Sequence, residues 1–238
     1  IRARHPVADG RIVTIHRGTD LAAFADPGIP ERAAALRRQW GVKDGARVIL
    51  QLARLTGWKG QAVVIDALAQ IKGHADCVAV LAGDAQGRED YLAALRARIA
   101  EQGLEGRVIL PGHCADVPAA MTAAEIVVVA SVEPEAFGRA AVEGQAAGRP
   151  VIVSELGAVG ETVATPPTVA DEERTGWKVP PGDPAALAKA LATALDLDHE
   201  QRAALGDRAR THVRSAFSLE AMTDRTMDVY RGLLGHRS

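Results

Sequence analysis

The 238-residue sequence is poor in aromatic side chains and almost balanced in charge, and both features exclude classes of protein. Phe, Trp and Tyr make up 3% of the residues, so a surface that stacks nucleic-acid bases on aromatic rings is not expected. The 28 basic and 30 acidic residues give a net charge of −2, which argues against a strongly basic nucleic-acid-binding domain. We therefore expect no nucleic-acid partner.

Cysteine is also scarce. The two cysteines, Cys77 and Cys114, form no C-x-x-C pair, so zinc-finger spacing is absent. They could form one disulfide, but each lies in or just after an apolar run, which favours free, buried thiols in a reducing compartment. The sequence contains no G-x-G-x-x-G segment, which argues against a nicotinamide-dependent enzyme. Ser154 lacks the G-x-S-x-G context of a serine hydrolase.

Long hydrophobic runs are missing as well. No apolar stretch approaches the roughly 20 residues needed to cross a bilayer, and no signal peptide is visible, so we expect no transmembrane segment. Hydrophobic residues make up 47% and charged residues 24%, which is typical of a globular core. The sequence begins at Ile1 without a methionine and is short for two full domains, so we expect a piece of a longer protein.

Strand-like and helix-like segments alternate through the first two thirds of the sequence. Short apolar runs typical of strands lie at 48–52, 77–81, 108–110, 126–129 and 151–153. Apolar residues at helical spacing occur at 64–71, 92–99 and 137–147. This order predicts an α/β fold, with a parallel sheet and helices on both faces.

The last third is mainly helical. Residues 177–179 suggest a short edge strand. Asp183 and Pro184 are typical of a helix start, with Asp as N-cap and Pro at the first helical position. Another helix is expected at about 200–216, and a final one after Ser218.

Two cations follow the first strand of the predicted sheet. Ligands bind beyond the carboxyl ends of the strands in such sheets, so the residues after each strand are candidates. Arg54 and Lys59 lie five residues apart among glycines that allow close backbone approach. Arginine can hold two phosphate oxygens and lysine adds a compact charge. The alternative is a pair of surface cations bound to helix carboxylates, but the strand-end position favours phosphate.

Two carboxylates flank a second candidate anion site. Pro134 favours an extended entry, so Glu135 precedes a helix, and Gly138 leaves free N–H groups near the helix start that suit an anion. Glu143 is eight residues further on, about 12 Å at a helical rise of about 1.5 Å per residue. Each carboxylate could accept hydrogen bonds from vicinal hydroxyls, one set on a sugar and one on a ribose. The alternative is that Glu143 is an ordinary exposed helix residue.

Five segments, in order, resemble one known family. Residues 135–152 resemble the E-x7-E signature of retaining family 4 glycosyltransferases with the GT-B fold. The other four are residues 15–21, similar to I-P-N-G-V-D; Arg54 with 58–60, similar to R-x4-K-G; Gly83-Asp84, similar to G-D; and 175–183, similar to T-G-x-x-V-P-P-G-D. The resemblance covers nearly the whole chain.

The resemblance implies a Rossmann-like domain that is the C-terminal half of a GT-B fold. Residues 1–20 would be the interdomain segment and first strand, 21–218 the nucleotide-sugar-binding domain, and 219–238 a helix that packs back on a missing N-terminal domain. That domain would carry the acceptor site, so the chain alone would bind sugar nucleotide weakly and transfer nothing.

The family also implies roles for single residues. Arg54 and Lys59 would hold the donor diphosphate and stabilise it as leaving group, and Glu135 would orient the hydroxyls of the donor sugar. These three are the catalytic candidates. The other candidate donor-binding residues are Gly83, His113, Cys114, Phe137, Gly138 and Glu143. The implied reaction is a retaining, front-face transfer to an acceptor hydroxyl, which needs charge stabilisation at the phosphate more than a nucleophile.

Some positions depart from the family or suggest other chemistry. Ala158 replaces the second glycine of the family's G-G-x-P-E and could hinder a positive φ. Asp196-Leu197-Asp198 resembles a metal-binding D-x-D, but its place at a helix end favours capping. We expect no cofactor and no metal.

Two other functions compete with the transferase. A nucleotide-sugar epimerase of similar architecture would need carboxylates and a histidine across two domains, and the E-x7-E run favours the transferase. A non-catalytic binding module is disfavoured because the cations and both glutamates are present. The family further implies a glycan or lipid-linked acceptor and a place in the cytoplasm, or on the inner membrane face.

Overall fold

The computed structural model describes residues 12–235, and its centre is a sheet of six parallel strands. The order across the sheet is β3-β2-β1-β4-β5-β6. The strands are β1 (Arg47–Leu52), β2 (Cys77–Ala82), β3 (Val108–Ile109), β4 (Ile126–Val129), β5 (Val151–Ser154) and β6 (Trp177–Val179). Strands β2 and β3 are added on one side of β1, whereas β4, β5 and β6 are added on the other. This switch in strand order, between β1 and β4, is the place where ligands bind in open α/β sheets. The predicted fold class is confirmed.

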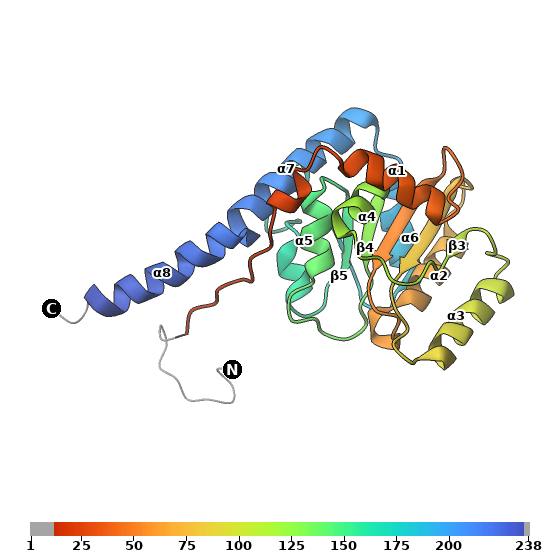
Figure 1. The fold of residues 1–238 in the computed structure, drawn as a ribbon, viewed down its shortest axis with the longest axis horizontal. Coiled ribbons are helices and arrows are strands. Elements are labelled where there is room, and N and C mark those ends of the chain that lie inside the picture. The colour runs from red at the N-terminus through yellow and green to blue at the C-terminus, as the bar shows by residue number, and fades with distance from the viewer. Residues whose placement is uncertain (1–11, 236–238) are drawn as a thin grey trace.

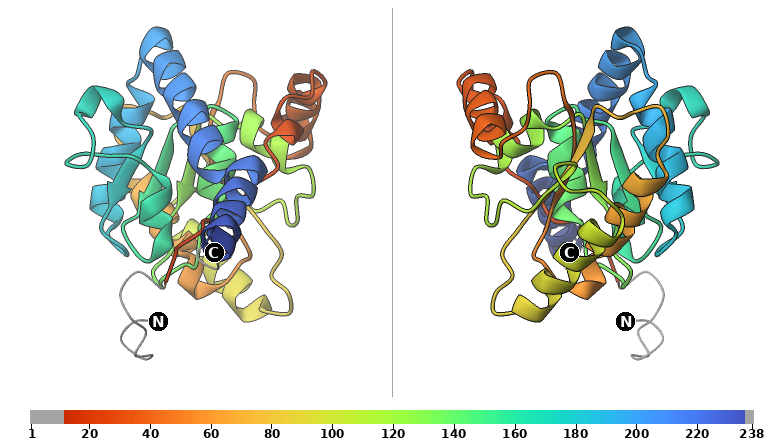
Figure 2. Two further views of the ribbon diagram at one scale, coloured as in Figure 1. Left: turned by 90° about the vertical axis from the view of Figure 1, so that its left-hand side faces the viewer. Right: turned by 90° about the vertical axis from the view of Figure 1, so that its right-hand side faces the viewer.

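Helices cover both faces of this sheet (Figures 1 and 2). One face packs against α2 (Gln61–Gln70), α3 (Glu89–Glu101) and α6 (Pro184–Leu195), and the other against α1 (Ile29–Gln39), α4 (Val117–Ala123) and α5 (Arg139–Ala146). Neighbouring side chains of a strand point to opposite faces, so Ile49 joins the first core and Leu50 the second, both fully buried. Strand β4 is buried on both faces, as its unbroken apolar run predicts.

Short 3-10 turns link several of these elements. They are η1 (Ala22–Phe24), η2 (Gly57–Lys59), η3 (Ala158–Thr162) and η4 (Asp171–Glu173). η2 lies in the loop after β1 and η3 follows β5, so both stand at the carboxyl end of the sheet.

Two helices, α1 and α4, are absent from the sequence prediction. Both carry a proline at the first or second helical position. Asp116 caps α4, accepting a hydrogen bond from the Ala119 N–H at 3.1 Å, just as Asp183 caps α6. α4 could therefore have been recognised by the signature that revealed α6. α1 gives a weaker signal, because only Ile29 and Ala33 of its residues are buried.

Two long helices end the chain. α7 (His199–Phe217) packs on α5, and α8 (Leu219–Gly235) continues outward from the domain beyond Ser218 (Figure 1). The incoming chain joins this corner, where the Thr19 N–H donates to the Phe217 carbonyl at 2.8 Å. Five large apolar side chains on α8 are exposed: Leu219, Met227, Tyr230, Leu233 and Leu234. Among the described helices, none is both long enough and apolar enough to cross a membrane.

The D-x-D segment caps helices, as predicted. Asp196 ends α6, and Asp198 begins α7, where its carboxylate accepts from the Gln201 N–H at 2.8 Å. The Gln201 side chain returns a bond from the Asp198 N–H, which completes a capping box. The predicted interdomain segment lies partly outside the described residues, since these begin at residue 12.

Candidate active site

A cavity of about 870 Å³ opens at the carboxyl ends of β1 and β4. All nine residues predicted as a site line it: Arg54, Lys59, Gly83, His113, Cys114, Glu135, Phe137, Gly138 and Glu143. They come from four stretches of the chain, which follow β1, β2, β3 and β4. The fold thus brings together residues whose proximity the sequence only implied, at the point of the sheet where ligands are expected.

Arg54 presents a free guanidinium on a fixed backbone. Its side chain is exposed and has no hydrogen-bond or ion-pair partner among residues 12–235. Its carbonyl accepts from the buried Gln61 side chain at 2.9 Å, and the Tyr91 hydroxyl donates to Gln61 at 3.0 Å. The main chain is therefore anchored from α2 and α3 while the charge remains available to a ligand.

The loop after β1 presses against the end of β4. Gly60 has φ +72°, and a Cβ at this position would overlap the Ala130 carbonyl oxygen. One hydrogen bond crosses this contact, from the Val132 N–H to the Trp58 carbonyl at 2.8 Å, while Gln51 of β1 donates to the Lys59 carbonyl at 2.6 Å and holds the loop on its own strand. Glycine at position 60 is required by both conformation and space, and it sets the distance between the two walls of the cavity.

Lys59 is paired with Glu135 across the cavity wall. The distance from Lys59 Nζ to Glu135 Oε1 is 2.7 Å, and the two side chains are only 15% and 10% exposed. The Ser131 hydroxyl donates to the same carboxylate oxygen. The ammonium also lies 4.1 Å from the centroid of the Trp58 ring, within cation–π range. Two residues predicted to bind different parts of one ligand thus bind each other here.

Glu135 stands on a non-helical segment. It bridges to Gly157, and its carbonyl accepts from the Ala158 N–H at 2.9 Å. Because α5 begins only at Arg139, the helical rise does not measure the spacing of Glu135 and Glu143, and the estimate of about 12 Å has no structural basis. The positive φ of this region, +66°, falls on Gly157 and not on Ala158, so alanine is tolerated in η3.

Glu143 is buried, so its interpretation as an ordinary exposed helix residue is wrong. Only 7% of the residue is accessible. Arg139, one turn earlier, donates to Glu143 Oε1 at 2.9 Å and is itself 61% exposed in its side chain. Arg139 lines the cavity and escaped the sequence prediction, although the i, i+4 spacing of opposite charges on a helix would have suggested the pair.

The start of α5 offers unpaired N–H groups to the cavity. Its N-cap is Gly138, so no side chain caps the helix. The first N–H groups of a helix lack intrahelical partners and carry partial positive charge, which suits an anion. Gly138 has φ +83°, and a Cβ there would overlap the Val159 side chain. This glycine therefore lets η3 support the helix start.

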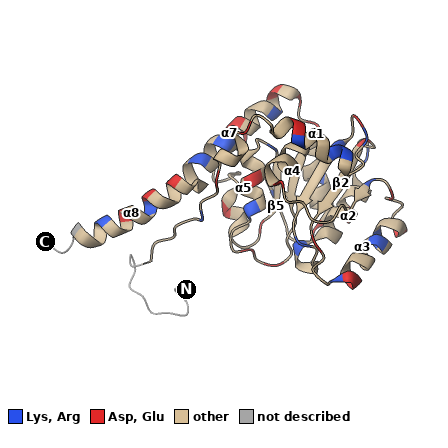
Figure 3. Ribbon diagram, in the orientation of Figure 1, with Lys and Arg blue, Asp and Glu red and all other residues tan. Residues whose placement is uncertain are grey.

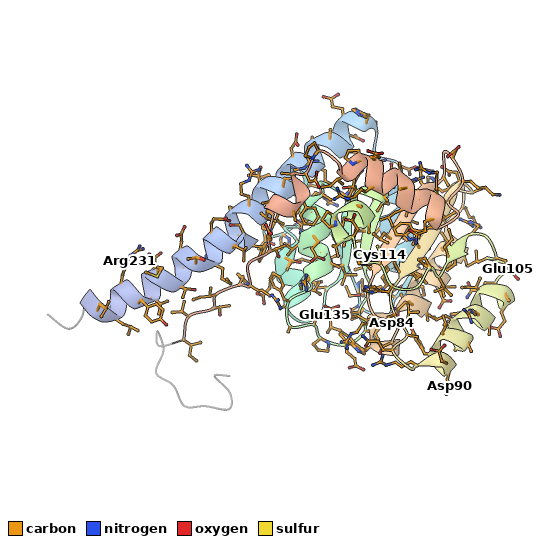
Figure 4. The ribbon with its side chains drawn as sticks, in the orientation of Figure 1. Asp84, Asp90, Glu105, Cys114, Glu135 and Arg231 are labelled. Atoms are coloured by element: carbon orange, nitrogen blue, oxygen red, sulfur yellow. The ribbon has the colours of Figure 1, made fainter. Side chains whose placement is uncertain are left out.

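The two thiols are free and buried, as predicted, and they lie at opposite ends of the sheet. Cys77 begins β2 at the amino end, where burial raises its pKa to about 11. Cys114 lines the cavity beside the exposed His113, and burial also raises the pKa of its thiol. Figure 4 marks Cys114, Asp84 and Glu135 in the body of the domain, with Arg231 far out on α8. In the part of the chain that the structure describes, no three His, Cys, Asp or Glu side chains are grouped to hold a metal ion.

Comparison with known proteins places these features in one family. The model of the family described as Glycosyl transferases group 1 matches residues 33–212. The D-inositol 3-phosphate glycosyltransferase of Corynebacterium efficiens is 32% identical over 225 residues, which cover 92% of this chain and 50% of that protein. The chain thus spans about half the length of the curated relatives it matches.

Solved structures share the fold. Anabaena HepE, crystallised with UDP and glucose, superimposes with a TM-score of 0.79 at 30% identity, covering 92% of this chain and 56% of that one. A glycosyltransferase from Rickettsia africae gives a TM-score of 0.86 at 28% identity, covering 96% of this chain and 59% of that one. The six-stranded parallel sheet with helices on both faces therefore matches one part of these longer chains.

Proposed function

The chain belongs to the group 1 family of glycosyl transferases, and from this premise we propose that it is the donor-binding half of a retaining enzyme. The enzyme would move a sugar from a nucleoside diphosphate sugar to an acceptor hydroxyl. The observation that carries this proposal is the meeting of Arg54, Lys59, Glu135 and Glu143 in one cavity at the switch in strand order of the sheet.

The donor diphosphate would lie between the loop after β1 and the start of α5. Arg54 offers an unpaired guanidinium, Lys59 offers an ammonium, and the first N–H groups of α5 add partial positive charge. As the bond to the sugar breaks, negative charge grows on the leaving diphosphate, and fixed positive groups stabilise it. In our proposal that phosphate also receives the proton of the acceptor, so no metal and no protein nucleophile take part.

The two carboxylates would bind hydroxyl groups on either side of the diphosphate. We assign the hydroxyls of the donor sugar to Glu135 and those of the ribose to Glu143. Glu143 is held by Arg139 at 2.9 Å, so the ribose would share this carboxylate with the guanidinium. The backbone at His113 and Cys114 would line the base, and that of Phe137 and Gly138 would face the sugar and phosphate.

The acceptor site would belong to a second domain. The chain spans about half of its curated relatives, and α8 presents an exposed apolar row. We propose that residues 219–238 pack on an N-terminal domain that carries the acceptor, with residues 1–20 as the connection and 21–218 as the donor domain. The acceptor classes to test are a glycan, a lipid-linked sugar and a phosphorylated polyol such as D-inositol 3-phosphate, after which the curated relatives are named. A place in the cytoplasm or on the inner membrane face remains part of this proposal.

Calorimetry with UDP-, GDP- and ADP-sugars, with and without EDTA, tests the proposal. We expect weak binding of one nucleotide class, unchanged by EDTA, and no transfer by this chain alone. Loss of binding in EDTA would overturn metal independence, and robust turnover would overturn the assignment as half an enzyme. If no nucleotide binds, the non-catalytic module is the better interpretation. NMR of the incubated sugar nucleotides would reveal an epimerase by a change of sugar configuration.

A further inference from the structure

The carboxylate of Glu135 is held by one of its two oxygens. Oε1 accepts from Lys59 Nζ at 2.7 Å and from the Ser131 hydroxyl. Oε2 has no hydrogen-bond partner among residues 12–235. It is not one of the buried unpaired polar atoms, so it is accessible. Since Glu135 lines the cavity, Oε2 is the oxygen open to it. The two donors therefore fix which face of the carboxylate a ligand meets.

The two donors differ in mobility. Ser131 is fully buried, two residues beyond the end of β4, and its short side chain is tied to the sheet. Lys59 carries its charge on a flexible four-carbon stem and lines the same cavity as Arg54. An anion that enters the cavity can draw the ammonium toward itself, whereas the serine hydroxyl stays with the wall.

A diphosphate and Glu135 compete for the same ammonium. In the structure the Lys59 charge is satisfied by Glu135 in a setting shielded from water, with side-chain exposures of 15% and 10%. A diphosphate that recruits Lys59 must weaken this pair. Without a second donor, the carboxylate would then be free to turn away from the position that binds sugar hydroxyls.

We propose that Ser131 is a positioning residue for Glu135, which holds Oε1 in place when Lys59 exchanges Glu135 for the donor diphosphate. Oε2 then accepts from a hydroxyl of the donor sugar. This inference rests on the proposed function for the sugar, but the exchange at Lys59 requires only an anion with two linked phosphates. Ser131 contacts no reacting atom and acts through Glu135.

Glu135→Gln tests the exchange with inorganic pyrophosphate as probe, which carries no base or sugar. The glutamine keeps the shape of the side chain and can still accept from Ser131, but it no longer attracts the ammonium by charge. Calorimetry should therefore show pyrophosphate binding about fivefold tighter to this variant than to the wild-type chain, the size expected for a modest ion pair. If pyrophosphate bound to Glu135→Gln as tightly as to wild type, or more weakly, the proposed exchange at Lys59 would be overturned. This outcome does not depend on the nucleotide measurements.

Ser131→Ala tests the positioning role, with Ser154→Ala as matched control. Ser154 is also a buried serine at the carboxyl end of a central strand, β5, but it makes no side-chain hydrogen bond to the described residues and does not line the cavity. The affinities for UDP and UDP-glucose, GDP and GDP-mannose, and ADP and ADP-glucose are measured for wild type and for each variant. The affinities of the variants are then compared with those of wild type for the pair of nucleotides that wild type binds.

We expect Ser131→Ala to bind the nucleoside diphosphate with an affinity within about twofold of wild type. The ratio of sugar-nucleotide affinity to diphosphate affinity should fall by about five- to tenfold, which is the cost of losing one hydrogen bond to a charged group. Ser154→Ala should keep both values. A ratio unchanged in Ser131→Ala would overturn the positioning role, as would an equal fall in Ser154→Ala. If the wild-type chain binds none of the pairs, the proposed function and the positioning role both fail, while the pyrophosphate result still decides the exchange.

Discussion

Basic side chains serve different purposes at the two ends of the parallel sheet. At the amino end, several arginines donate to main-chain carbonyls, among them Arg37 to Ala123, Arg47 to Leu195, Arg149 to Thr122 and Arg202 to Leu197. At the carboxyl end, Arg54 has no side-chain partner among the described residues, and Lys59 and Arg139 bind only carboxylates that line the cavity. Arg54, Lys59 and Arg139, which line the cavity, thus lack the main-chain carbonyl partners that hold these arginines at the amino end.

The difference has a physical reason. These four carbonyls lie at or just beyond the carboxyl ends of α4 and α6, where the helix dipole favours a cation. Carboxylates on a cavity wall can change partners when a ligand arrives. Figure 3 shows acidic and basic residues spread over the whole domain and along α8, so charge density by itself does not mark the site.

Substitution of the glycine between the cavity walls should have the largest effect on stability. Gly60→Ala forces a Cβ against the Ala130 carbonyl between the cavity walls, whereas Gly45→Ala, in the turn before β1, meets no atom within 4 Å. Both positions have positive φ, so each should cost about 1 kcal/mol for conformation. We expect Gly60→Ala to lower the free energy of unfolding by more than about 3 kcal/mol, measured by urea denaturation. Equal losses in the two variants would show that the close approach of the walls contributes nothing.

Replacement of Arg54 by alanine should weaken ligand binding without lowering the stability of the domain. Arg54→Ala should weaken sugar-nucleotide binding by about 1.5–3 kcal/mol, the value of a charged hydrogen bond, and change the free energy of unfolding by less than about 0.5 kcal/mol. Calorimetry and urea denaturation on the same variant measure both.

Arg47→Ala is its control at the opposite end. Arg47 binds both oxygens of Asp76, at 2.6 and 2.9 Å, and the Leu195 carbonyl at 3.0 Å. Its loss should lower the free energy of unfolding by about 2 kcal/mol and leave nucleotide affinity unchanged. If Arg54→Ala destabilised the domain as much as Arg47→Ala, the distinction between the two ends would fail.

The smallest effect concerns the reactivity of the two thiols. Cys77, with a pKa of about 11, should be about one part in a thousand thiolate at pH 8 and react with iodoacetamide only after unfolding. Cys114 should also react slowly, since burial raises its pKa, but its place in the cavity leaves it 9% exposed. We expect bound sugar nucleotide to slow alkylation of Cys114 alone, as followed by mass spectrometry. Equal protection of both cysteines would indicate global stabilisation in place of a local ligand. Raising the pH increases both rates, because more thiolate forms.

Much of the fold follows from local sequence signals. The five apolar runs and the edge strand at Trp177 became the six strands, because a buried parallel sheet needs short, continuous apolar segments. The strand order does not follow from any one segment, but right-handed crossovers and the family resemblance restrict it. α1 was missed because most of its surface faces solvent, so its apolar periodicity is weak.

The sequence predicted many of the residues that line the cavity, but not Arg139 or Ser131 and not the contacts between them. Strand ends and family motifs located Arg54, Lys59 and Glu135, because residues that follow parallel strands lie at the carboxyl edge of the sheet in any loop conformation. The bond between Lys59 and Glu135 joins residues 76 positions apart and depends on the packing of Gly60 against Ala130, which no sequence spacing reveals. Ser131 carries no charge and belongs to none of the motifs, so only the geometry reveals its contact with Glu135.

The pairing of β1 with β4 has a consequence for how the domain acquires its site. Ile49 lies beside Ile126, so two chain regions that are separated in sequence by α2, β2, α3, β3 and α4 must meet before the cavity exists. Long-range parallel pairing of this kind is slow to form, and neither chain region alone encloses the cavity. Any compound that fits between the two regions therefore recognises only chains that have finished folding, and its effect on the melting temperature reports on the cooperativity of the entire sheet.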